Sequence, residues 1–453
     1  MKRRPLDLYI EAREPLPQEM SEISYRCIPN ERLQGPLPGE LDADGTGLAP
    51  RCLSELRALE DRALTQVRKG GRLANCDESV YVGGPGVAYM LLKAAVIRGE
   101  PDLLDEVESY LEPWEAELDH LGGRHPGLSC SLLCGKAGWL CVDAMRRHAM
   151  GDAAGAAEAA AAYAKLFPTA RSAVLDADEW LYGRAGYLQG LLVLRSLVGD
   201  AALRVELVDG IAEAILDNGQ RCAARVQSRW PLMWSWHGRL YLGAAHGVAG
   251  IVFMLLHVES VIGSPRWRGL LVDTLRQLAA ARTEDGNWPS KCGERSGGLV
   301  HFCHGAPGMA LLFCKAHAVL GEAWLLEEAR RAGETVWQFG LLKKGPGICH
   351  GMAGNGYALL ALFRSTGDAS WLLRAHFFAS QMLADNVVSI CRKPDNPLSL
   401  FEGLAGTVCF LLDLRTQPSA ATLPFFDVAG LTSCARVRNP PQEPPPKGAR
   451  IQA

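Results

Sequence analysis

Apolar helical segments recur along this chain, and each of them follows a Gly-x-x-Gly motif. The motif occurs seven times, with steps of 52, 48, 64, 58, 46 and 52 residues between the first glycines. These first glycines are Gly83, Gly135, Gly183, Gly247, Gly305, Gly351 and Gly403. A repeat this regular indicates one supersecondary unit used seven times, so the units are expected to share one core.

Charged, amphipathic segments alternate with the apolar ones. They include residues 55–67, 101–118, 204–216, 266–281, 324–339 and 369–383. A helix that is apolar all round must be buried, and an amphipathic helix can cover it. The pattern therefore predicts an all-α fold, an α/α toroid in which seven helix pairs form an inner and an outer helical barrel. An open solenoid is the competing architecture, but solenoids usually need polar end repeats, and the first and last units here resemble the middle ones.

The two ends of the chain differ from the repeated region. Residues 1–48 are polar and contain prolines and glycines, so we expect an irregular N-terminal segment before a toroid domain at residues 49–428. Residues 429–453 contain the run Asn-Pro-Pro-Gln-Glu-Pro-Pro-Pro, which is typical of a disordered or polyproline tail. Such a tail is most often a solvated end, although a proline-recognition domain could bind it.

The overall composition is that of a globular protein, with 48% hydrophobic and 21% charged residues. The net charge of −3 gives no indication of nucleic-acid binding. The apolar stretches are much shorter than the roughly 20 residues that span a bilayer, so no membrane-spanning protein is expected. Lys2 excludes N-myristoylation, no apolar signal core is visible, and cysteines isolated in apolar segments suit a reducing compartment, so we expect a cytoplasmic location.

Two successive repeats carry the tripeptide Cys-His-Gly at the repeat glycine, at residues 303–305 and 349–351. Thiolates and imidazoles are zinc ligands, and three protein ligands leave the fourth tetrahedral position open, as in catalytic zinc sites. We therefore predict that Cys303, Cys349 and His350 bind Zn²⁺. Buried cysteines with capping histidines are the alternative, and the repetition at equivalent positions favours the metal.

Two further histidines, His246 and His304, occupy the same repeat position as His350. Histidine titrates near neutral pH and is a natural general acid or base beside a metal, so His246 is predicted to transfer a proton. For His304 three roles stay open: a fourth metal ligand, a hydrogen-bond donor to one of the metal ligands, or a proton-transfer group. Glu179 and its neighbour Asp178 precede the third turn, where an acidic pair is either functional or simply solvated.

Charged residues also precede the sixth and seventh turns. Lys344 follows Lys343, and a second group comprises Arg392, Lys393 and Asp395. Cations at this rim could hold the carboxylates of a small acidic ligand, although charge pairs in loops are most often only solvated.

These motifs resemble those of the LanC-like family, eukaryotic relatives of the bacterial lanthionine synthetase C cyclases. The resemblance covers roughly residues 75–428, and its most specific stretches are residues 182–187, 241–247, 300–308, 341–351 and 397–403. It implies a toroid of seven helix pairs, with zinc on Cys303, Cys349 and His350 and with His246 as the acid/base residue. It also implies glutathione binding near Lys344 and around residues 392–395.

The resemblance further implies an enzyme that adds the thiol of glutathione to dehydroalanine or dehydrobutyrine residues in proteins or peptides. His304 replaces a tyrosine of the bacterial pattern, Glu179 an aspartate and Leu299 an arginine, which disfavours peptide cyclisation but not glutathione addition. We expect His246, His304 and Glu179 to act in catalysis. The alternative is a non-catalytic adaptor that binds zinc and glutathione, and a histidine beside an open coordination position favours the enzyme.

Overall fold

The structure, a computed structural model, describes residues 22–33, 40–70, 77–116, 118 and 127–428. The predicted proline-rich tail at 429–453 therefore lies outside the described residues, as do residues 1–21. Part of the segment that we expected to be irregular forms a short helix, α1 (Glu22–Arg26).

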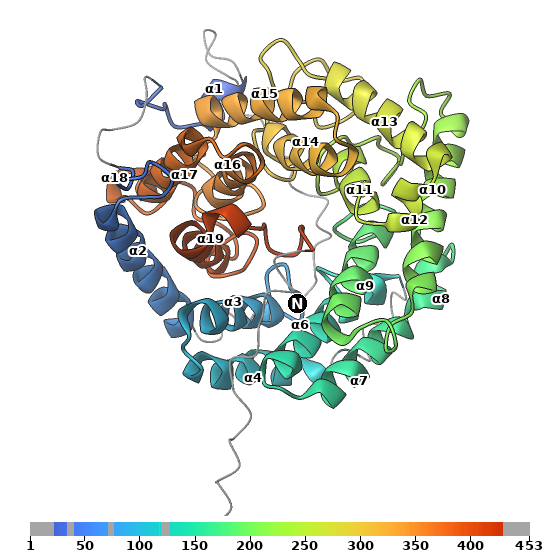
Figure 1. Cartoon of the computed structure of the whole chain (residues 1–453), viewed down its shortest axis with the longest axis horizontal. Coiled ribbons are helices and arrows are strands. Elements are labelled where there is room, and N and C mark those ends of the chain that lie inside the picture. Colours follow the sequence, from blue (N-terminus) through green and yellow to red (C-terminus); the bar gives the residue numbers. More distant parts are fainter. Residues whose placement is uncertain (1–21, 34–39, 71–76, 117, 119–126, 429–453) are drawn as a thin grey trace, which may run out of the picture.

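Seven helices form an inner ring within the described part of the chain, and each begins at a Gly-x-x-Gly motif (Figure 1). In every case the N-cap residue is the first glycine of the motif. The inner helices are α3 (Gly84–Arg98), α6 (Lys136–Ala149), α9 (Arg184–Val198), α11 (Val248–Leu255), α14 (Ala306–Leu320), α16 (Met352–Thr366) and α19 (Leu404–Thr416).

An outer ring surrounds these helices, and Figure 1 shows the two rings as concentric layers. Its members are α2 (Pro50–Lys69), α4 (Asp102–Glu115), α7 (Ala153–Ala164), α10 (Val205–Arg225), α13 (Pro265–Ala280), α15 (Ala323–Phe339) and α17 (Ala369–Met382). Short helices lie in the connections: α8 (Phe167–Arg171), α12 (Glu259–Gly263), α18 (Asp385–Val388), η3 (Leu128–Cys130) and η4 (Pro418–Ala420). The described ranges contain isolated β-bridges but no named strand, which confirms the predicted all-α toroid.

The ring closes through the two ends of the domain. Each inner helix packs against the next, and the last of them, α19, packs against the first, α3. Five inner helices (α3, α6, α9, α14 and α16) pack against the outer helix that follows them, whereas α19 packs against α2 from the start of the domain. The open solenoid is therefore excluded.

The second glycine of each motif is required by a close backbone approach. A Cβ atom at Gly250 or Gly354 would lie 1.9 Å from a carbonyl oxygen six residues earlier in the chain, and the corresponding distance at Gly308 is 2.5 Å. No side chain fits at such distances, so the chain must carry glycine where the turn folds back on its helix. At Gly305 the first glycine is needed as well, because its φ is +107°.

Backbone hydrogen bonds link the turns around the ring at one repeat position, two residues before the first glycine. The amide of Cys303 donates to the carbonyl of Cys349 (3.2 Å), and the amide of Cys349 donates to Phe401 (2.8 Å). The amide of Phe401 then donates to Tyr81 (3.1 Å), which joins the seventh repeat to the first. These bonds hold the turns of neighbouring repeats together. The side chains at this position and at the next one therefore lie at one end of the inner barrel.

Among the described residues, no helix has both the length and the apolar character that crossing a bilayer requires. The cytoplasmic location stays a prediction.

Candidate active site

A cavity of about 550 Å³ opens at the end of the inner barrel where the turns meet. Six of the predicted site residues line it: His246, Cys303, His304, Lys344, Cys349 and His350. The volume falls in the range of roughly 300–1,000 Å³ that is usual for small-molecule sites. The repeat equivalence of the turns therefore brings together residues that are far apart in the sequence.

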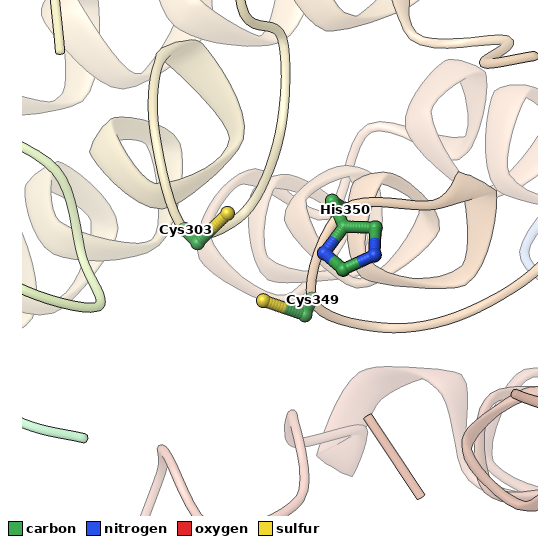
Figure 2. Close-up of side chains that lie close together, drawn as sticks. All are labelled: Cys303, Cys349 and His350. Atoms are coloured by element: carbon green, nitrogen blue, oxygen red, sulfur yellow. The ribbon is translucent and has the colours of Figure 1, made fainter. Parts of the chain in front are cut away.

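The three predicted metal ligands converge from two successive turns. The sulfur atoms of Cys303 and Cys349 and a ring nitrogen of His350 all lie within 4.8 Å of one another, and Figure 2 shows the three side chains around a common space. A tetrahedral zinc ion has bonds of about 2.0–2.3 Å and holds its ligand atoms roughly 3.5 Å apart. Small side-chain adjustments would close the set on an ion, so the donors fit zinc in both type and position.

The sulfur atoms interact with each other in the structure. A hydrogen bond from the Cys303 thiol lowers the pKa of Cys349, and the same contact raises the pKa of Cys303. Burial lowers the pKa of His350, but its contact with the Cys349 sulfur and the charge of Glu402 outweigh burial and raise the pKa overall. One thiolate is therefore already favoured at this position, which suits a ligand that must be deprotonated to bind a metal.

Two residues beside the predicted ligands were missed by the sequence analysis, although their repeat positions could have revealed them. Tyr81 stands two residues before its repeat glycine, as Cys303 and Cys349 do, and its hydroxyl contacts the Cys349 sulfur. Glu402 stands directly before its glycine, as His350 does, and is 4% exposed. Comparing all seven turns position by position would have placed both residues at the rim.

Glu179 and His246, which were both predicted to act in catalysis, are in direct contact. Nδ1 of His246 lies 2.8 Å from Oε2 of Glu179, a residue that is 1% exposed. The same carboxylate accepts hydrogen bonds from the amides of Leu181 (2.9 Å) and Tyr182 (2.6 Å). A carboxylate can only accept, so Nδ1 of His246 carries the proton and Nε2 is the ring nitrogen left for a substrate.

Aromatic residues surround His246. The indole ring of Trp236 lies parallel to the imidazole, with ring centroids 4.1 Å apart and an interplanar angle of 3°. Trp236 belongs to a two-residue hairpin, in which it exchanges two 3.0 Å backbone hydrogen bonds with Arg239. His237 and Gly238 at the tip have φ values of 47° and 69°, so His237 is a turn residue rather than a member of the cavity wall.

His304 is a neutral neighbour of His246. Their ring centroids lie 6.1 Å apart. Burial, followed by the charge of His246, lowers the pKa of His304 to about 3. The Nδ1 atom of His304 is buried and has no hydrogen-bond partner within the described part of the chain.

The charged residues predicted at the rim divide into two groups. Lys344 lines the cavity, whereas Arg392, Lys393 and Asp395 are exposed and are not among the lining residues. The second group lies next to the first, because the amide of Arg392 donates to the carbonyl of Lys343 (2.7 Å).

The cavity wall carries more positive than negative charge. Among its lining residues, five are Lys or Arg and two are Glu. The positive members are Arg26, Arg239, Lys291, Arg295 and Lys344. Arg26 arrives through the N-terminal segment, where the amide of Lys343 donates to the Arg26 carbonyl (3.2 Å), a pairing that the sequence pattern did not indicate. An anionic ligand is favoured in such a cavity.

Fold and site together define an α/α toroid with a cysteine–histidine cluster and a carboxylate-anchored histidine in one cavity. A model of the lanthionine synthetase C-like protein family matches residues 75–428, and the chain belongs to this family. Glutathione S-transferase LANCL1 of Danio rerio is 35% identical over 379 residues, which are 83% of this chain and 90% of the relative. Nisin cyclase has the same fold, with a TM-score of 0.60 and 16% identity over 84% of this chain and 98% of the cyclase.

Proposed function

We propose that this protein is a zinc-dependent transferase that adds the thiol of glutathione to dehydroalanine or dehydrobutyrine residues of proteins or peptides. The observation that carries the proposal is the shared cavity of the Cys303–Cys349–His350 cluster and the Glu179-anchored His246. The name of the Danio rerio relative supports glutathione as the thiol, and the fold of nisin cyclase supports thioether formation.

The ligand cluster would supply the nucleophile. Zinc held by Cys303, Cys349 and His350 would lower the pKa of a thiol at its open position, so that thiolate persists at neutral pH. Lys344, with the other cations of the cavity wall, would attract the glutathione carboxylates. We place Arg392, Lys393 and Asp395 at the outer end of that subsite, next to the Lys343 carbonyl.

His246 would complete the addition. The glutathione sulfur bonds to the β-carbon of the dehydro residue, and the π electrons of its double bond move toward the α-carbon and carbonyl. Nε2 of His246 donates the proton that the α-carbon needs, and the proton lost by the thiol later restores the imidazolium. Glu179 stabilises the imidazolium and holds its orientation. His304, neutral and buried, lies beside His246, where it can contact the carbonyl or relay a proton.

The test combines metal analysis with detection of the product. The purified protein is expected to bind one zinc ion and to form a glutathione adduct on a dehydroalanine peptide, measured by mass spectrometry. Cys303→Ala should lose both zinc and adduct, and His246→Ala should lose only the adduct. Cys314→Ala and His317→Ala are matched controls, because both residues lie on α14 outside the cavity lining.

Two outcomes would contradict the proposal. Zinc with no adduct above the uncatalysed rate would favour the non-catalytic adaptor that binds zinc and glutathione. Absence of zinc from the wild-type protein would remove the central premise.

A further inference from the structure

The end of the described chain returns into the barrel. After η4, residues 421–427 are buried, and Figure 1 shows this end of the described chain reaching from α19 into the space that the inner ring encloses. Phe425 and Phe426 are both 0% exposed, at a position where a domain end would ordinarily lie on the surface. The backbone of Phe425 has a φ of 54°, which an aromatic residue rarely adopts and which surrounding contacts must hold.

Those contacts come from the barrel wall. The indole N–H of Trp180 donates to the carbonyl of Phe425 (3.0 Å), and the Phe425 ring lies 4.7 Å from that of Tyr89. Asp427 pairs with Arg364 (3.2 Å), which also donates to the carbonyl of Ala421 (2.8 Å). The segment is therefore fixed at both of its ends, with Phe426 between them.

The ring of Phe426 lies under the turns of the site. It contacts Trp180 (centroid distance 5.2 Å) and Phe302 (4.9 Å) edge to face, and it stacks on Phe253 (4.2 Å). Trp180 in turn contacts Phe302 (5.6 Å) and Phe401 (5.7 Å). We call Trp180, Phe302, Phe401 and Phe426 the axial cluster.

Three members of the axial cluster are chain neighbours of site residues. Trp180 follows Glu179, Phe302 precedes Cys303, and Phe401 precedes Glu402. The proton-donor side and the metal-ligand side of the cavity therefore rest on one set of packed rings. Phe426 is the only member that comes from outside the repeat turns, so it can set the spacing between them without belonging to either side.

We propose that Phe426 is a positioning residue, which holds the turn of Cys303 and the turn of Glu179 at the separation that the site requires. The inference rests on the proposed function, because the site is the one that we propose to be catalytic. What it predicts directly is the geometry of the Cys303–Cys349–His350 cluster. Removing the ring would leave a cavity beneath Trp180 and Phe302. The two turns would stay linked by 3.3 Å backbone hydrogen bonds through Ala245 and by the Trp180–Phe302 contact, but they would lose the apolar support that Phe426 gives to both.

The test measures metal affinity rather than turnover. Phe426→Ala is expected to weaken Zn²⁺ binding, measured by chelator competition, by about 10-fold, the lower end of the range found when groups that hydrogen-bond to metal ligands are changed, because Phe426 supports the turn and not a ligand itself. The thiolate-to-cobalt absorption of the Co²⁺-loaded protein should shift as well. Phe378→Ala is the matched control, since Phe378 is 0% exposed but packs on Trp337 in the outer ring.

A rescue experiment separates positioning from general destabilisation. Benzene binds apolar cavities left by truncated side chains, so it should restore most of the Zn²⁺ affinity of Phe426→Ala. If that variant does not fold, Phe426→Leu keeps an apolar side chain and should show a smaller loss in the same direction.

The outcomes for the two proposals are distinct. Wild-type Zn²⁺ affinity in folded Phe426→Ala, or an equal loss in Phe378→Ala, would overturn the positioning role. Zinc binding without glutathione addition by the wild type would overturn the proposed function and leave the positioning role standing. Failure of the wild type to bind metal would overturn both.

Discussion

The indole of Trp236 covers one face of His246, with the two rings 4.1 Å apart and within 3° of parallel. The hydrogen bond to Glu179 fixes the rotation of the imidazole within its ring plane, and the stacked indole fixes the orientation of that plane. Together the two contacts leave His246 one orientation, in which only Nε2 is available to a substrate. Geometry of this kind is what proton transfer to a carbon atom needs.

Replacing Trp236 by Leu should therefore lower kcat for glutathione addition with little change in KM for glutathione. A stacked aromatic pair contributes about 0.5–1.5 kcal/mol, which corresponds to a loss of roughly 2- to 12-fold. Trp236→Phe keeps a stacking surface and should recover most of the rate. Steady-state kinetics with a dehydroalanine peptide give both parameters, and an effect confined to KM would show that Trp236 binds substrate instead.

Glu179→Gln should reduce adduct formation by about 10²- to 10⁴-fold, because the amide neither stabilises the imidazolium nor holds one tautomer of His246. The zinc content should not change, since Glu179 lies outside the ligand cluster. Asp178→Asn is the matched control: this neighbouring acid pairs with Arg184 at 2.9 Å and does not contact His246. Equal losses in both variants would point to a damaged turn rather than to a lost proton-transfer partner.

A buried charge pair joins the first and last inner helices where the ring closes. Nζ of Lys93 on α3 lies 2.6 Å from Oδ2 of Asp413 on α19, and the hydroxyl of Tyr357 donates to the same oxygen (2.8 Å). Lys93→Met should lower the free energy of unfolding by about 3–5 kcal/mol, because it leaves a buried carboxylate without its cation.

A triple variant, Lys93→Met with Asp413→Leu and Tyr357→Phe, removes the whole polar group and should recover most of that loss. Urea unfolding of the two variants and the wild type gives the comparison. A triple variant as unstable as the single one would mean that the pair determines how α3 and α19 dock.

The repeated architecture could be predicted because its physical cause is local. The glycines at the helix starts are needed for close backbone approach within each turn, and the apolar segments are needed for burial, so both features recur in the sequence. The convergence of Cys303, Cys349 and His350 could be predicted for the same reason, since equivalent turn positions meet at one end of a closed ring.

Residues that reach the site by other routes left no such signal. Trp236 arrives on a hairpin and Arg26 on a segment that pairs with residue 343, so neither follows the repeat. The burial of Phe426 inside the barrel could not be predicted either. The sequence around it has no pattern that distinguishes a buried segment from an exposed one. The sequence predicts a domain end at residue 428, but it does not predict the path of the residues just before it.

Acid should weaken the fold through the contacts that anchor this axial segment. Burial lowers the pKa of His257 from 6.5, so the native state resists its protonation and loses stability as the pH falls below about 6.5. Burial tends to raise the pKa of Asp427, but the nearby imidazole of His257, whose Nε2 lies 3.7 Å from Oδ1 of Asp427, and the charges of Arg364 and Lys315 hold it well below its ordinary value of 3.8. The stabilisation by Asp427 is therefore present at neutral pH and is lost as the pH falls below 3.8.

Asp427→Asn should lower the free energy of unfolding by about 1–3 kcal/mol at pH 7, and its stability should decline less steeply than that of the wild type below pH 4. Urea unfolding between pH 7 and pH 3 measures this, with Asp200→Asn as the control because the Asp200 side chain is 76% exposed. Parallel pH curves for the wild type and Asp427→Asn would show that this carboxylate does not anchor the segment.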